Sequence, residues 1–279
     1  GGTKLLSKVT SFGFVIGTVI PGIIVIVLGI VWIVMKKPLG FEELTATETT
    51  VAKVVDGVAK ARWLPDLTNL NNLSYLSGIV LLFAGVEVQA VHASEMKNPK
   101  KQYPLAIFIS AIIVFALFTF GSLAIAAVVP NSELQLESGL MQALSTMLKS
   151  VKMSWALPVL AFCVAFGSLA GVLSWISGPS KGLLSTAKEG VLPESLAETT
   201  KAGAPKNMML IQGIIVTILA CLYFVMKDVS VAFFLLSALT IAVYIIMYLM
   251  MYAAAIVLRK KQPNLERPYK APALPLIAG

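Results

Sequence analysis

Six long apolar stretches constrain what this chain can fold into more than any other feature of its sequence. A helix that crosses a bilayer needs about 20 mostly apolar residues. Hydrophobic residues make up 57% of the 279, and the mean hydropathy is +0.85, which is more apolar surface than a water-soluble domain of this size can bury. The sequence therefore predicts an all-α membrane protein, a multi-pass bundle of transmembrane helices. The stretches of about the required length are residues 9–35, 73–91, 105–129, 154–177, 208–226 and 229–258.

The distribution of positive charge predicts which ends of these helices face the cytoplasm. When the connecting segments are assigned alternately to two sides, 14 of the 22 Lys and Arg residues fall on one side and 8 on the other. The side with more positive charge is cytoplasmic by the positive-inside rule. The net charge of +8 thus reflects membrane topology, and we expect no nucleic-acid partner.

A carboxylate lies inside the second apolar stretch. Glu87 follows Gly85-Val86, and a charged group in hydrocarbon costs several kcal/mol unless other groups compensate it. Gly85 weakens the helix just before the acid, so we expect the backbone to open there. An interrupted helix with a buried acid is typical of a transport pathway. The alternative is a protonated acid that forms a hydrogen bond between packed helices.

Several connecting segments carry local patterns. Valines recur at helical spacing between residues 42 and 60, which predicts an amphipathic surface helix there. Residues 137–144 predict a short helix at the outer mouth. The motif at 178–182 matches the Gly-x-Ser-x-Gly elbow of serine hydrolases, but that elbow follows a strand and needs a histidine partner. We interpret it as a flexible turn at an inner gate, and we expect no enzymatic activity.

Three motifs, taken in order, resemble one family of transporters. The first is Phe-Ala-Gly-Val-Glu at 83–87, followed by Glu-Met-Lys-Asn-Pro at 95–99. The second is Ser-Trp-Ile-Ser-Gly-Pro-Ser-Lys-Gly at 174–182, followed by Gly-Val-Leu-Pro at 190–193. The third is Arg-Pro-Tyr-Lys-Ala-Pro at 267–272. Together they resemble the amino acid–polyamine–organocation (APC) family, most closely its bacterial glutamate/GABA antiporter branch.

The resemblance implies an inverted-repeat fold of two five-helix units followed by further helices. On this template the six spans are similar to the fifth to tenth helices, and residues 274–279 resemble the start of a seventh span here. We therefore expect residues 1–279 to form one partial transmembrane transporter domain in the bacterial inner (plasma) membrane. The first four or so helices and the C-terminal helices would lie outside it.

The resemblance also implies roles for particular residues. Glu87, with Gly85 at the helix break, matches the family acid linked to gating or proton coupling. Trp175 matches a tryptophan that closes over substrate, although an interfacial tryptophan is an equal alternative. Tyr244 and Tyr248 lie four residues apart on one helix face and match two tyrosines of the glutamate/GABA branch. An aromatic packing ridge is the alternative for them.

The chain departs from its relatives at two places. Leu81 and Leu82 stand where some antiporters have aromatic and hydroxyl side chains, and this departure weakens any assignment of cationic substrates such as arginine. The span containing Gly171 lacks an acid that the glutamate/GABA branch can carry. His92, the only histidine, is a candidate pH sensor at the inner mouth, with a hydrogen-bonded helix end as the alternative.

These observations predict a secondary amino acid antiporter that works by alternating access. Exchange of the glutamate/GABA type, with proton linkage through Glu87, is the interpretation we favour. A proton-coupled amino acid symporter and a sensor that binds without transporting are the two alternatives. The expected partners are an amino acid substrate, protons and the lipid bilayer, with no cofactor and no metal.

Overall fold

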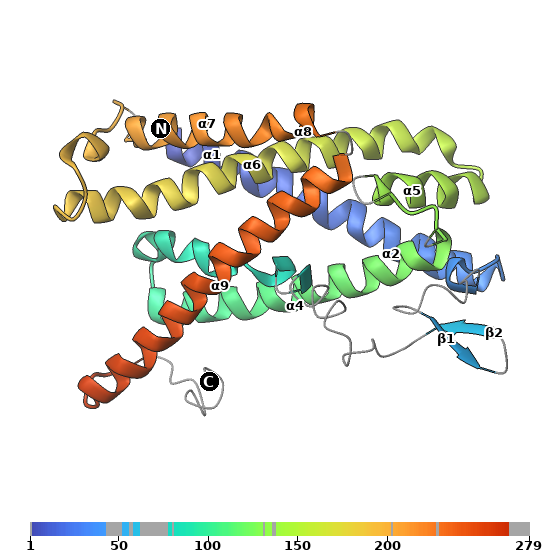
Figure 1. Cartoon of the computed structure of the whole chain (residues 1–279), viewed down its shortest axis with the longest axis horizontal. Coiled ribbons are helices and arrows are strands. Elements are labelled where there is room, and N and C mark those ends of the chain that lie inside the picture. The colour runs from blue at the N-terminus through green and yellow to red at the C-terminus, as the bar shows by residue number, and fades with distance from the viewer. Residues whose placement is uncertain are drawn as a thin grey trace.

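The fold is described from a computed structural model of the chain, and it is a bundle of long helices (Figure 1). The residues that the structure describes are 2–42, 52–55, 58–61, 78–79, 81–130, 132–135, 138–201, 203–226 and 229–267. Its helices and strands, in chain order, are α1 (Gly2–Phe14), η1 (Val15–Val19), α2 (Ile20–Val34), η2 (Gly40–Glu42), β1 (Ala52–Val55), β2 (Val58–Ala61), η3 (Val86–Glu95), α4 (Pro99–Val128), α5 (Gly139–Ser150), η4 (Ser154–Ala156), α6 (Leu157–Lys188), η5 (Glu194–Ala197), α7 (Lys206–Ala220), α8 (Leu222–Val225) and α9 (Val229–Lys261).

Five helical segments of the described chain are long and apolar enough to cross a membrane. They coincide with five of the six predicted spans, and they confirm the all-α membrane class. At most 22% of the most apolar part of each segment is buried inside the protein, as expected where helix surfaces face lipid. The sixth predicted span, 73–91, is described only in part, and the predicted start of a seventh lies outside the described residues. The five segments are Leu5–Val34, Pro99–Val128, Ser154–Lys188, Lys206–Val225 and Val229–Lys261.

The first span is continuous but irregular. Between α1 and α2 the helix widens into a π-helical turn, η1, just before Pro21. Gly17 in this turn lies against Gly167 of α6, so closely that a side chain on either residue would collide with the other backbone. Gly171, four residues further along α6, has open space beside it.

The buried core lies where α2, α4, α5 and α6 meet. Leu144 and Met147 of α5 are almost fully buried there, beside Val25 of α2 and Val128 of α4. The short helix predicted at 137–144 is therefore present within Gly139–Ser150, and it is packed into the core on its apolar face. Trp32 of α2 also belongs to this core, and its indole N–H donates a hydrogen bond to the carbonyl of Pro38 at 2.9 Å.

Two expectations about connecting segments are wrong. In the part of 42–60 that the structure describes, the predicted amphipathic helix is replaced by an antiparallel hairpin, in which Val55 pairs with Val58. Valine is a strong strand former, and the Asp-Gly pair between these two residues is a signature of two-residue hairpins. The hairpin projects beside the end of α2 (Figure 1). The predicted turn at 178–182 is also absent, because α6 continues as a helix to Lys188 with Pro179 in its interior.

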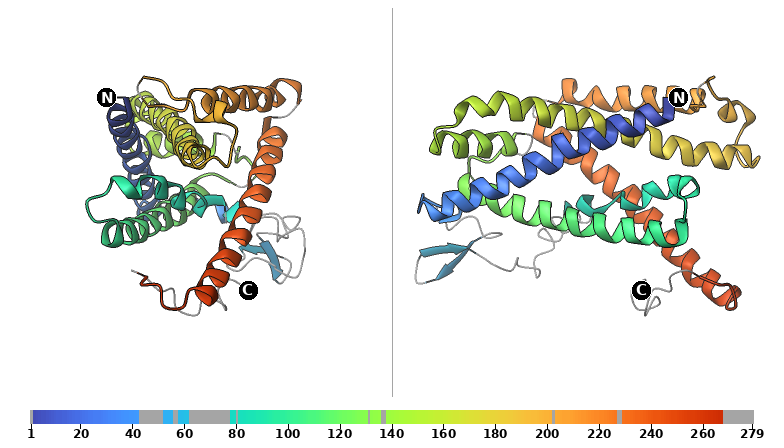
Figure 2. Two further views of the ribbon diagram at one scale, coloured as in Figure 1. Left: turned by 90° about the vertical axis from the view of Figure 1, so that its left-hand side faces the viewer. Right: turned by 180° about the vertical axis from the view of Figure 1, so that it is seen from behind.

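Helix α9 stands apart from α1 and α2. It crosses the bundle diagonally (Figure 1), and an end-on view places it on the opposite side from α1 (Figure 2, left). Its main backbone contact in the described part of the chain is with the short helix α8. Side chains of α9 also reach the region of Glu87, where Tyr248 hydrogen-bonds the carboxylate.

Candidate functional site

The helix of the second predicted span breaks at Gly85. This residue has φ of +95°, a left-handed conformation that glycine adopts without steric cost. The chain before it, residues 81–83, is α-helical, and the chain after it continues as the 3₁₀ helix η3. A Cβ atom at Gly85 would collide with the indole ring of Trp175 from α6. The break predicted from the sequence is therefore present, and two independent constraints require glycine at this position.

The helix η3 rests against two glycines of α6. A Cβ atom at Gly178 would lie 2.9 Å from Cγ1 of Val88, and one at Gly182 would lie 3.1 Å from Cγ1 of Val91. Val88 and Val91 are three residues apart, which is the repeat of a 3₁₀ helix, so both lie on one side of η3. The Gly-x-Ser-x-Gly motif is thus part of a helical surface on which η3 packs. This packing explains the two glycines of the motif without a catalytic elbow.

Glu87 follows the break and is held by groups on either side of it. Its Oε2 accepts hydrogen bonds from the backbone N–H of Gly85 and from the hydroxyl of Tyr248 on α9, each at 3.1 Å. The Gly85 N–H also lies 3.4 Å from the Tyr248 hydroxyl oxygen. The other carboxylate oxygen, Oε1, is buried and has no hydrogen-bond partner among the described residues. One oxygen of Glu87 is therefore fixed, while the other keeps an unused acceptor position.

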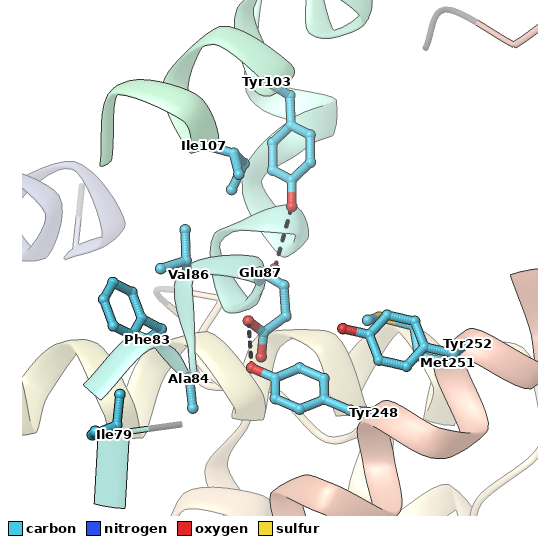
Figure 3. A pocket seen from close by; sticks show the side chains of 10 residues that line it. All are labelled: Ile79, Phe83, Ala84, Val86, Glu87, Tyr103, Ile107, Tyr248, Met251 and Tyr252. Atoms are coloured by element: carbon cyan, nitrogen blue, oxygen red, sulfur yellow. Dashed lines mark hydrogen bonds between the residues drawn. The ribbon is translucent and has the colours of Figure 1, made fainter. Parts of the chain in front are cut away.

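A cavity of about 540 Å³ opens beside Glu87. This volume lies within the range of about 300–1,000 Å³ that is typical of small-molecule sites. Figure 3 shows Tyr103 of α4 reaching Glu87 from one side and Tyr248 and Tyr252 of α9 from another. Acidic, hydroxyl and apolar groups therefore share one surface. The lining residues are Ile79, Phe83, Ala84, Val86, Glu87, Tyr103, Ile107, Tyr248, Met251 and Tyr252.

Aromatic rings connect this cavity to α6. The ring centroids of Tyr244 and Tyr248 are 5.7 Å apart, and the ring of Tyr252 stacks on that of Tyr248 with a centroid distance of 6.3 Å. Trp175 meets the ring of Tyr244 edge-on at 6.3 Å. Because Trp175 also contacts Gly85, α6 and α9 both reach the helix break through aromatic side chains. Trp175 remains about half exposed at this position.

The structure brings the five predicted substrate and gating residues together. Gly85, Glu87, Trp175, Tyr244 and Tyr248 form one connected group, although their roles in binding or gating remain predictions. The backbone of the predicted pH sensor, His92, is part of η3, and its side chain lies outside what the structure describes.

Sequence reasoning assigned no role to Tyr103. Its hydroxyl donates a hydrogen bond to the backbone carbonyl of Glu87 at 3.4 Å. The signal available in the sequence was the reversal between Glu95 and Pro99, which folds α4 back along η3. That reversal places a residue near the start of α4 opposite Glu87, but it does not indicate which one.

Comparison with known proteins decides the family. The amino acid permease family profile matches residues 1–279, the whole chain. The chain belongs to this family. Among curated permease relatives, an uncharacterized transporter of Legionella pneumophila is 39% identical over 282 residues, which cover all of this chain and 57% of the relative.

Two further relatives carry functional names. A glutamate/gamma-aminobutyrate antiporter of Lactococcus lactis is 32% identical over 275 residues, or 98% of this permease chain and 52% of the relative. A probable agmatine/putrescine antiporter of the same species is 27% identical over 72% of the chain. The chain spans about half the length of the curated relatives it matches most fully.

Proposed function

We propose that this chain forms part of a secondary amino acid antiporter of the bacterial plasma membrane, which works by alternating access. The observation that supports it most directly is the group around Gly85, where a broken helix brings Glu87 beside a cavity lined by tyrosines. Broken helices near the membrane midplane are where transporters of inverted-repeat type bind their substrates. The relatives named as antiporters favour exchange over one-way uptake.

The proposed exchange is of the glutamate/GABA type, in which one amino acid enters as another leaves. Oε1 of Glu87 is the atom at which a proton would add, because it is buried and has no partner among the described residues. Tyr248 holds Oε2, so adding a proton at Oε1 leaves this hydrogen bond in place. Glu87 would thereby link exchange to protons, as intramembrane acids do in other transporters.

The test is counterflow by the purified full-length permease in proteoliposomes. Vesicles preloaded with glutamate or GABA are compared with empty vesicles for uptake of labelled amino acid. An antiporter takes up label only when the vesicles contain substrate. Uptake into empty vesicles driven by a proton gradient would instead indicate a symporter, and binding without uptake would indicate a sensor; either result contradicts the proposal.

A panel of internal substrates then defines the specificity. We expect glutamate and GABA to support exchange better than arginine, because Leu81 and Leu82 replace polar and aromatic residues beside the helix break. The panel is run at several pH values with the membrane potential clamped. Preference for arginine or agmatine would move the permease to the branch of the cationic-substrate relative.

A further inference from the structure

Tyr103 contacts η3 at Glu87, the residue through which the proposed function links exchange to protons. It belongs to the first turns of α4, which the chain reaches through residues 96–98 after η3 ends at Glu95. This short reversal makes α4 run back along η3. Tyr103 therefore lies opposite Glu87, sixteen residues earlier, and its hydroxyl donates to the Glu87 carbonyl. The view in Figure 3 shows this ring pointing from α4 toward the backbone of Glu87.

We propose that Tyr103 is a positioning residue, which fixes the backbone of Glu87 and so sets the orientation of its carboxylate toward the cavity. The inference rests on the proposed function and adds a residue to which the motifs assign no part. Two anchors then hold Glu87 from two helices: Tyr103 of α4 holds its main chain, and Tyr248 of α9 holds its side chain.

The local backbone needs such an anchor. A 3₁₀ helix has strained hydrogen-bond geometry, and runs longer than three or four residues are uncommon. The helix η3 has ten residues and begins directly after the left-handed Gly85. On its α6 side, Val88 and Val91 rest on glycines. These apolar contacts limit how closely η3 approaches α6 but do not direct a carbonyl, whereas the Tyr103 hydroxyl binds one particular backbone oxygen.

Losing this anchor has a specific consequence. The carboxylate would remain attached to Tyr248 and Gly85, while the main chain at Glu87 would lose its hydrogen bond to α4. Oε1 would then no longer keep a constant orientation beside the cavity. The maximal rate of exchange should fall, while the affinity for substrate should change little, because Tyr103→Phe keeps the ring that lines the cavity.

The competing interpretation is that Tyr103 only fills space between α4 and η3. Tyr103→Phe separates the two, because it keeps the ring and removes the hydroxyl. Tyr223→Phe in α8 is the matched control, since Tyr223 lies away from the cavity lining. A space-filling role predicts that both variants behave as the parent protein.

The deciding measurement does not require transport. In the full-length permease with its native cysteines replaced, a cysteine is placed at Val86, which lines the cavity, and its labelling rate by a small maleimide is followed. We expect Tyr103→Phe to raise this rate roughly 3- to 10-fold, the factor that corresponds to one neutral hydrogen bond. An unchanged rate overturns the proposal, even if the permease exchanges amino acids normally.

Transport gives the second measurement. In proteoliposomes, Tyr103→Phe should lower the maximal exchange rate roughly 3- to 10-fold while KM stays within about twofold. A loss confined to KM would mean that Tyr103 contacts substrate instead, and it would overturn the positioning role. If the parent protein fails to exchange at all, the proposed function fails, and the labelling experiment still tests Tyr103.

Discussion

Tyr248 and Glu87 are joined by a hydrogen bond of 3.1 Å that connects α9 to the helix break across 161 residues of sequence. The backbone of α9 otherwise has its main contact with α8 in the described part of the chain. This bond and the contact between Tyr244 and Trp175 both connect α9 to the region of the break. This bond therefore joins α9 directly to the carboxylate that the proposed function uses.

Removing the Tyr248 hydroxyl should weaken this link. Tyr248→Phe keeps the ring stacked between Tyr244 and Tyr252 but leaves Oε2 of Glu87 with only the Gly85 N–H. A hydrogen bond to a carboxylate contributes about 1.5–3 kcal/mol, so we expect the exchange rate to fall at least about tenfold. Initial rates in proteoliposomes measure this, with Tyr223→Phe as the control. A Tyr248→Phe protein with parental rates would show that the bond has no part in exchange.

Gly85 should tolerate no side chain. Alanine there would be forced into a left-handed conformation, which costs about 1–2 kcal/mol, and its methyl group would collide with Trp175. We expect Gly85→Ala to lower the thermal unfolding midpoint in detergent and to abolish exchange. Gly121→Ala in α4 is the control: nothing lies within 4 Å of its added atom, and alanine favours helix over glycine by about 0.5–1 kcal/mol.

A smaller side chain at position 175 separates the effect of the collision with the indole ring from the effect of the backbone strain at residue 85. In the double variant Gly85→Ala with Trp175→Ala the collision is gone, but the backbone strain remains. Partial recovery of the unfolding midpoint relative to Gly85→Ala is therefore expected. Full recovery would mean that the left-handed backbone costs nothing, and no recovery would mean that the indole ring moves aside without cost.

Gly178 and Gly182 of α6 should accept a larger side chain only if the packing of η3 against them changes. Gly178→Val places a branched side chain where Cγ1 of Val88 lies within 2.9 Å of the first added atom. Overpacking of this kind costs about 1–3 kcal/mol, and Val88→Ala in the same protein should recover part of it. Unfolding midpoints of the four proteins in this cycle measure the coupling. Additive effects would contradict the contact between Gly178 and Val88.

The spans were predictable from the sequence because hydropathy and length depend on local composition alone. The break at Gly85 was predictable for the same reason, since glycine before a buried acid is a local signal. Family motifs identified Glu87, Trp175, Tyr244 and Tyr248, and the fold places them together. The sequence did not show which of these side chains contact each other, because those contacts depend on how α6, α9 and η3 cross.

The errors have physical causes too. The valines near residues 51–58 fit a helical spacing, yet their branched side chains favour strands, and the Asp-Gly pair favours a hairpin. At 178–182, glycine and proline were expected to end α6. Pro179 removes only one backbone donor, and long membrane helices tolerate this because few alternatives satisfy the remaining backbone groups. The two glycines instead leave space on α6 for Val88 and Val91 of η3.

The last prediction concerns the proton. If Glu87 exchanges a proton during each cycle, Glu87→Gln fixes the residue in a neutral form that still accepts a hydrogen bond from Tyr248 through its amide oxygen. The protein should fold, and its exchange rate should lose the pH dependence that the parental rate shows. The measurement is amino acid exchange in proteoliposomes with equal pH inside and outside. Glu133→Gln, in the connection between α4 and α5, is the control and should keep the parental profile. A parental pH profile in Glu87→Gln would assign proton linkage to another group and leave Glu87 a structural role at the break.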